Sequence, residues 1–137
     1  PPARPFFMAR ILLIEDDDPL REVLPTVLTN AGHAVTQAED GQQGVDLFRA
    51  EPTDLVITDI IMPRKEGIET IATLRREMPG LPIIAISGGA SHSGFYLDVA
   101  AKLGAQRTLA KPFTPPQLLA AIKELLPLPP PGGFADS

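Results

Sequence analysis

The chain has 137 residues, enough for one domain with a buried core and too few for two comfortable ones. It contains no cysteine, which excludes disulfides and thiolate metal sites. Its net charge is -5, so it has no excess of basic residues of the kind that nucleic-acid-binding proteins carry. The sequence holds no apolar run of the roughly 18 residues that a membrane span requires. We therefore expect a cytoplasmic protein without membrane or direct nucleic-acid contacts.

Short apolar runs alternate with amphipathic stretches, which predicts five strand–helix units built around a parallel sheet. The first helix should begin near Asp18 and Pro19, with Asp18 as its N-cap, because an acidic cap often precedes a proline in the first helical turn. Pro25 falls inside this helix, where it removes a backbone hydrogen bond and should kink the helix. The fourth helix should start late, after the glycine-rich stretch that follows Ser87. The predicted strands are 10–14, 34–37, 55–58, 83–86 and 107–110, and the other predicted helices are 42–49, 68–77 and 115–126.

The two ends of the chain depart from this alternation. Residues 1–7, PPARPFF, contain three prolines, and we interpret them as an expression remnant before a native start at Met8. Residues 127–137 are rich in proline and glycine, which predicts an extended or flexible tail. The predicted folded domain is therefore 8–126.

Polar residues suited to phosphoryl chemistry follow four of the predicted strands. Because the carboxyl ends of parallel strands meet at one edge of a sheet, these residues should lie together. Like charges about 4 Å apart repel by about 4 kcal/mol at an effective dielectric of 20, so a carboxylate cluster of this kind favours a divalent cation. With neither histidine nor cysteine beside it, Mg²⁺ suits the cluster better than zinc does. The residues are Glu15 and Asp16 after the first strand, Asp59 after the third, Ser87 after the fourth and Lys111 after the fifth.

Asp59 is the natural nucleophile of this cluster, because its strand should be the central one of the sheet. A carboxylate oxygen can attack phosphorus while a cation and the Lys111 ammonium neutralise the phosphoryl oxygens. The Ser87 hydroxyl can donate a hydrogen bond to the attached group. An acidic string on its own is more often a solvated loop, so the inference depends on the combination of all these residues.

These residues resemble the receiver domains of response regulators in two-component phosphorelay signalling. The resemblance covers about residues 10–126 and rests on four strings in order: LLIEDDDPLR, DIIMPRKEG, AISGG and LAKPF. It implies a flavodoxin-like doubly wound α/β fold with strand order 2-1-3-4-5. It also implies a single-domain receiver that takes a phosphoryl group on Asp59 from a histidine kinase or phosphotransfer protein. Such a protein catalyses only its own phosphorylation and dephosphorylation, so we do not expect an enzyme.

The resemblance assigns further roles to particular residues. Asp16 should be a direct Mg²⁺ ligand, Glu15 should act on the metal through water, and the Ile61 backbone carbonyl should be another ligand. Lys111 should pair with the phosphoryl group, and Ser87 should move toward it.

Three more expectations concern the backbone and the output surface. Pro112 should follow a cis peptide bond, and Gly67 should permit a backbone turn before the third helix. The modified protein should bind its partner through the face of the fourth and fifth helices. Many receivers place an aromatic residue on that face where this chain has Thr108. Phe95 and Tyr96 could substitute for it, although ordinary packing is the favoured interpretation of both.

Two other function classes remain open at this point. A pseudo-receiver would bind partners without phosphorylation, which the complete set of acidic, hydroxyl and lysine residues disfavours. An aspartyl-nucleophile phosphohydrolase usually carries a second acid two residues after the nucleophile, and that position here is Ile61. His33 and His92 are interpreted as surface residues rather than as phosphocarriers or ligands.

Overall fold

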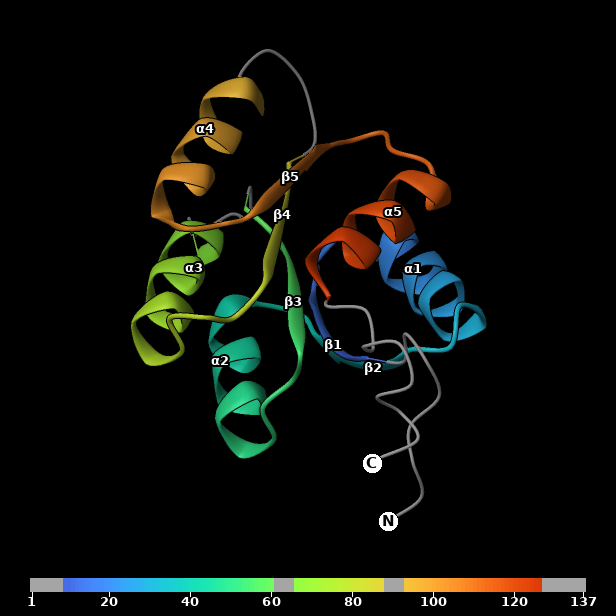
Figure 1. The fold of residues 1–137 in the computed structure, drawn as a ribbon, viewed down its shortest axis with the longest axis horizontal. Coiled ribbons are helices and arrows are strands. Elements are labelled where there is room, and N and C mark those ends of the chain that lie inside the picture. The colour runs from blue at the N-terminus through green and yellow to red at the C-terminus, as the bar shows by residue number, and fades with distance from the viewer. Residues whose placement is uncertain (1–8, 61–65, 88–92, 127–137) are drawn as a thin grey trace, which may run out of the picture.

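The fold alternates five strands with five helices, as predicted (Figure 1). The computed structural model describes residues 9–60, 66–87 and 93–126, so the predictions for 1–7, 127–137, Ile61 and His92 lie outside the described residues. The strands are β1 (Arg10–Ile14), β2 (Ala34–Ala38), β3 (Leu55–Asp59), β4 (Ile83–Ser87) and β5 (Arg107–Ala110). The helices are α1 (Asp18–Asn30), α2 (Gly41–Ala50), α3 (Glu66–Glu77), α4 (Ser93–Leu103) and α5 (Pro115–Leu125).

All five strands are parallel and lie in the order β2-β1-β3-β4-β5, which confirms the flavodoxin-like topology. β3 is the central strand. The chain passes from β1 outward to β2 and then returns to β3 on the other side of β1. The winding direction therefore reverses between β1 and β3, and ligands of such sheets bind beside this point, at the carboxyl ends of the strands.

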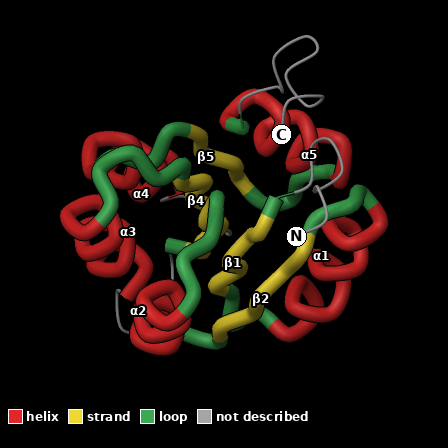
Figure 2. The backbone as a smooth tube through the Cα atoms, turned by 60° about the horizontal axis from the view of Figure 1, so that its bottom comes forward, coloured by secondary structure: helices red, strands yellow, loops and turns green. Residues whose placement is uncertain are grey.

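Helices cover both faces of the sheet, with α1 and α5 on one side and α2, α3 and α4 on the other (Figure 2). The inner strands β1, β3 and β4 are buried on both faces. Such strands read as continuous apolar runs, which is why the sequence indicated these three so clearly. Alternate side chains of β1 enter opposite cores: Leu12 and Ile14 pack with α2 and α3, whereas Ile11 and Leu13 pack with α1 and α5. The sheet is thus rigidly held beneath the edge where the polar residues lie.

The N-cap of α1 is Asp17, so the prediction of Asp18 was wrong by one residue. Asp17 has an extended backbone, and its Oδ2 accepts a hydrogen bond from the Leu20 N–H at 3.2 Å. Because an N-cap pairs with the third helical residue, Pro19 takes the second helical position rather than the first. Pro25 lies inside the helix as predicted.

His33 is buried, with 9% of its surface exposed, so its prediction as a surface residue was also wrong. It follows the end of α1 and lines a pocket together with residues of α5, a long-range relationship that the local sequence does not reveal.

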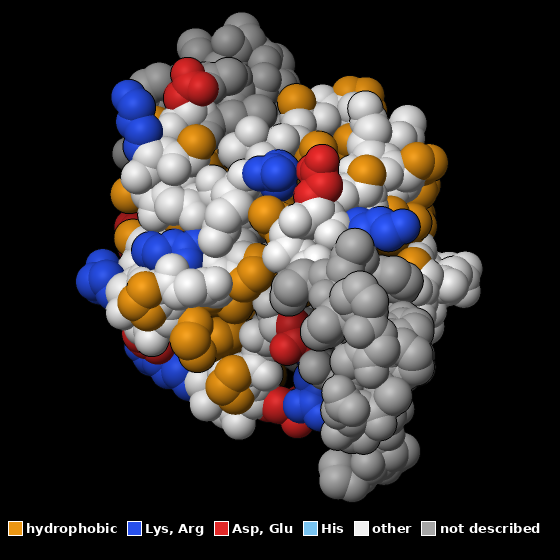
Figure 3. Space-filling view, in the orientation of Figure 1, with side chains coloured by type: hydrophobic (Ala, Val, Ile, Leu, Met, Phe, Trp, Pro, Cys, Tyr) orange, Lys and Arg blue, Asp and Glu red, His pale blue; other side chains and the backbone are white. Residues whose placement is uncertain are grey.

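The outer surface carries charges of both signs. On the face shown in Figure 3, basic and acidic side chains alternate with apolar ones rather than gathering by sign. Among the described residues, no helix combines the length and the apolar character needed to cross a membrane.

Candidate functional site

The ends of β1 and β3 bring three carboxylates together. Oxygen atoms of Glu15, Asp16 and Asp59 all lie within 4.8 Å of one another. Glu15 is 0% exposed and Asp59 is 3% exposed, whereas Asp16 is exposed to solvent. The cluster therefore has a buried floor, formed by Glu15 and Asp59, and a solvent-exposed rim, formed by Asp16. It lies at the edge of the sheet where these residues were predicted to meet.

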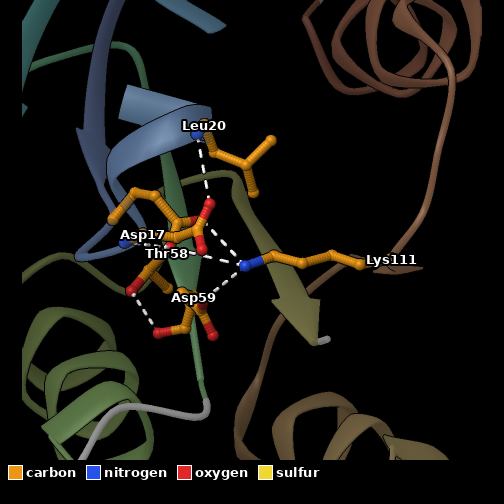
Figure 4. Close-up of polar contacts among 6 residues, drawn as sticks. Asp17, Leu20, Thr58, Asp59 and Lys111 are labelled. Atoms are coloured by element: carbon orange, nitrogen blue, oxygen red, sulfur yellow. Dashed lines mark hydrogen bonds and ion pairs between the residues drawn. The ribbon is translucent and has the colours of Figure 1, made fainter. Parts of the chain in front are cut away.

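Lys111 reaches this floor from the end of β5, and Figure 4 shows its side chain extended toward Asp59. Its Nζ donates a hydrogen bond to Asp59 Oδ2 at 2.7 Å and a longer one to Glu15 Oε2 at 3.4 Å. Glu15 Oε1 lies 3.3 Å from the same ammonium but accepts no hydrogen bond from the described residues. One cation thus compensates two buried carboxyl groups only in part.

The neighbouring charges and the burial of Glu15 change its pKa. Burial, the hydrogen bond with Asp59 and the charge of Asp59 raise the pKa of Glu15 to about 8, although Lys111 opposes the shift. Burial and the charge of Asp59 also raise the pKa of Asp16. Burial favours a lower pKa for Lys111, but its hydrogen bond with Asp59 and the charges of both carboxylates outweigh that effect and raise it. The raised pKa means that Glu15 takes up a proton more readily than a solvent-exposed carboxyl group does.

The same donor set fits a hard divalent cation. The cluster offers carboxylate oxygens alone, one of them, Glu15 Oε1, buried without a hydrogen-bond partner among the described residues. Oxygen ligands of this kind suit Mg²⁺ rather than zinc. A cation could take the place of the proton on Glu15. The predicted ligand Ile61 lies outside the described residues.

Ser87 ends β4 beside the cluster. Its neighbour Ile86 pairs with Asp59 across the sheet, and the Lys111 N–H donates to the Ser87 carbonyl at 2.7 Å. The Ser87 side chain is fully buried, and its Oγ has no hydrogen-bond partner among the described residues. An unused buried hydroxyl is costly, and this one lies next to the acidic edge.

Gly67 serves the site through close packing, and the turn predicted before the third helix falls on residues 61–65, outside the described residues. It lies in the first turn of α3, and a Cβ atom built there would clash with the Asp59 carbonyl oxygen and the Ile60 Cα. The absence of a side chain lets α3 pack directly against the backbone that carries Asp59. The cis Lys111–Pro112 bond agrees with the prediction.

Two residues that support the site were not predicted from the sequence. The Asp17 N–H donates to Glu15 Oε2 at 3.1 Å, so the residue that caps α1 also orients Glu15. The Thr58 hydroxyl donates to the Asp59 carbonyl at 3.0 Å (Figure 4). The position of Thr58 near the end of a buried apolar run is the sequence feature from which its contact with Asp59 could have been predicted. Thr108 is half-buried in β5, and the side chains of Phe95 and Tyr96 lie outside the described residues.

Comparison with known proteins agrees with this geometry. MprA of Mycolicibacterium vanbaalenii, a response regulator, is 37% identical over 117 residues, which cover 85% of this chain and 50% of that protein. The transcriptional regulatory protein CpxR of Escherichia coli is 36% identical over 119 residues, covering 87% and 50%. The chain thus spans about half the length of these curated relatives.

Solved structures of similar size match over nearly their whole length. Chemotaxis protein CheY4 of Vibrio cholerae is 27% identical with a TM-score of 0.78, covering 87% of this chain and 99% of that one. A CheY-like receiver domain protein of Methanospirillum hungatei is 29% identical with a TM-score of 0.78, covering 85% and 92%. The family model of the response regulator receiver domain matches residues 11–123. With this match added to the parallel fold and its acidic edge, the chain belongs to the response regulator receiver domain family.

Proposed function

We propose that the chain accepts a phosphoryl group on Asp59 from a histidine kinase or a phosphotransfer protein, and that the phosphorylated form changes its binding to a protein partner. The observation that carries this proposal is the 2.7 Å contact between Lys111 Nζ and Asp59 Oδ2 within a cluster of three carboxylates. The arrangement combines an oxygen nucleophile with a fixed positive charge. Both serve phosphoryl transfer to a carboxylate.

In the proposed reaction, an Asp59 carboxylate oxygen forms a bond to phosphorus as the phosphorus–nitrogen bond of a phosphohistidine breaks. The electron pair of that bond stays with the imidazole nitrogen of the donor, and the product is an acyl phosphate on Asp59. Lys111 pairs with the negative charge on the transferred group. The Ser87 hydroxyl donates a hydrogen bond to a phosphoryl oxygen and so gains the partner that it lacks among the described residues.

Glu15, Asp16 and Asp59 would hold Mg²⁺ at the open rim of the cluster. When bound, this ion supplies positive charge that neutralises the phosphoryl oxygens during transfer. Glu15 must release its proton to contribute a full negative charge, and Asp17 then keeps its carboxylate oriented through the backbone hydrogen bond.

The alternatives fit the site less well. A pseudo-receiver has no need of a lysine paired with a buried aspartate, and a hydrolase of free substrates would need a second acid where the chain has Ile61. The output route proposed here is the face of α4, β5 and α5. MprA is named a response regulator and CpxR a transcriptional regulatory protein, and the chain matches about half of each, so a role in transcription would require regions beyond the match.

The test is phosphorylation by a small donor such as acetyl phosphate in the presence of Mg²⁺, followed by intact-mass measurement. The wild type should gain one phosphoryl group, and Asp59→Asn should gain none. Asp46→Asn, which changes an exposed aspartate on α2, is the matched control and should behave as the wild type. A folded wild-type protein that remains unmodified with Mg²⁺ and donor present would favour the pseudo-receiver.

A further inference from the structure

The turn between α1 and β2 holds His33 in one backbone position. α1 is followed by Gly32, which has a positive φ of 98°. The Gly32 N–H donates to the Thr29 carbonyl at 2.9 Å, and the His33 N–H donates to the Leu28 carbonyl at 3.0 Å. This pair of bonds is the glycine-terminated helix end known as the Schellman motif. The His33 ring is therefore presented by a rigid turn.

The ring extends the pairing of β1 with β2 by one hydrogen bond. The carbonyl of Ala9, just before β1, accepts a hydrogen bond from the Ala34 N–H at 2.9 Å. The Ala9 N–H donates a hydrogen bond to His33 Nδ1 at 3.0 Å. Ala9 is only 2% exposed, so water cannot readily replace the acceptor. Because Nδ1 accepts this bond, it carries no proton, and the neutral ring carries its proton on Nε2.

The same ring lines a pocket of about 200 Å³ between the end of α1 and α5. Leu119, Ile122 and Leu126 give the pocket apolar walls, and Ala31 closes its α1 side. Lys123 from α5 is the charged residue among the described residues that line it. An imidazolium at His33 would thus lie against apolar walls. Burial already lowers the pKa of His33.

We propose that the hydrogen bond between Ala9 and His33 is an acid-sensitive latch, which fastens the start of β1 to the α1–β2 turn and opens when His33 takes up a proton. Protonation turns Nδ1 from an acceptor into a donor that faces the donating Ala9 N–H. The buried N–H then loses its partner, and the cationic ring is driven out of the apolar pocket toward water. The hydrogen bond lies at the opposite edge of the sheet from Asp59.

The direction of the pH effect follows from the lowered pKa. Neutral His33 is favoured in the folded protein, so the stability that it contributes is complete above its ordinary pKa of 6.5 and is lost as the pH falls below that value. The latch should therefore be closed at pH 7.5 and should open only as the pH falls below 6.5.

The test is a pH titration of the full chain by NMR together with thermal unfolding. At pH 7.5 the His33 ring nitrogens should show the tautomer with the proton on Nε2. Between pH 7 and 5 the Ala9 amide should lose protection against hydrogen exchange, measured relative to its intrinsic rate. Over the same range Tm should fall by about 3 °C or more relative to that of His33→Asn, which shares every other titrating group.

Two substitutions make the test specific. In His33→Asn the side-chain oxygen can take the place of Nδ1 as an acceptor that does not titrate, so the acid-induced loss of Ala9 protection should disappear. His33→Phe removes the acceptor, so Ala9 should be unprotected already at pH 7.5. The proposal is overturned if His33 titrates without any change at Ala9, or if His33→Asn loses protection with acid as much as the wild type does.

Discussion

Lys111 Nζ lies 2.7 Å from Asp59 Oδ2 and 3.3 Å from Glu15 Oε1, so one ammonium is shared by two buried carboxyl groups that come from different strands. This sharing links the stability of the acidic edge to its chemistry. When a phosphoryl group is attached to Asp59, the same ammonium is already in place to pair with it. Because Lys111 contacts both carboxyl groups, the effects of replacing it on stability and on phosphorylation can be predicted.

Lys111→Met should lower the rate of phosphorylation of Asp59 by about 100-fold, the cost of removing one preorganised charge partner from a transition state. Its effect on stability should be smaller than the roughly 3–5 kcal/mol of a broken buried ion pair, because Glu15 already holds a proton and solvent reaches Lys111. Initial rates by intact mass and urea unfolding measure the two effects. Lys102→Met, exposed on α4, is the control, and equal rates for both variants would contradict the prediction.

Ser87→Ala should separate stability from activity. The fully buried hydroxyl has no hydrogen-bond partner among the described residues, so its removal should change the free energy of unfolding by less than about 1 kcal/mol, or raise it. Phosphorylation should nevertheless slow by about tenfold, since a charge-assisted hydrogen bond to the transferred group is lost. Ser87→Thr keeps the hydroxyl and should retain the rate. A strongly destabilised Ser87→Ala variant with normal phosphorylation would show that the hydroxyl is structural instead.

The fold and the residues of the candidate site were predictable because both depend on local sequence patterns. Parallel strands covered on both faces appear as apolar runs, and the polar residue that ends each run must lie at one edge of the sheet. The cap at Asp17 was missed by one position, because local propensity does not distinguish adjacent aspartates.

Contacts between distant segments were not predictable in the same way. The burial of His33 depends on α5 and on Ala9, and the need for glycine at position 67 depends on how closely α3 approaches the Asp59 backbone. The division of the Lys111 ammonium between two carboxyl groups likewise requires coordinates. Each of these features arises from tertiary packing, to which a single sequence gives no direct access.

Gly67→Ala tests the close approach of α3 to β3. The added methyl group would clash with backbone atoms of Asp59 and Ile60, which cannot move as a flexible side chain would, so the variant should lose about 1–3 kcal/mol of stability. Gly80→Ala is a matched control, because nothing lies within 4 Å of its added Cβ and its effect should stay within about 0.5 kcal/mol. Urea unfolding of both variants measures the difference. Equal stabilities would mean that α3 can shift away from β3 at no cost.

The binding of Mg²⁺ should strengthen as the pH rises through the pKa of Glu15. Because this pKa is raised from 4.5 to about 8, the folded metal-free protein holds a proton that the unfolded chain releases, and the stability gained from it is complete below about pH 4.5 and lost as the pH rises through 8. Mg²⁺ competes with this proton. Its Kd should therefore fall by up to about tenfold per pH unit between pH 6.5 and 8, and then level off.

Thermal unfolding with and without Mg²⁺ at pH 6.5 and pH 8.5 measures this competition. The rise in Tm caused by Mg²⁺ should be larger at pH 8.5, since a tighter ligand stabilises the folded state more at the same concentration. Glu15→Gln keeps the shape of the side chain without a titrating proton, so its metal-free stability should vary less with pH and its response to Mg²⁺ should be weaker and nearly independent of pH. His33 contributes equally with and without Mg²⁺ at each pH, so its titration cancels in this comparison. A wild-type Mg²⁺ effect of equal size at both pH values would show that Glu15 has already lost its proton at pH 6.5, and that Lys111 compensates the two buried carboxylates more fully than their geometry indicates.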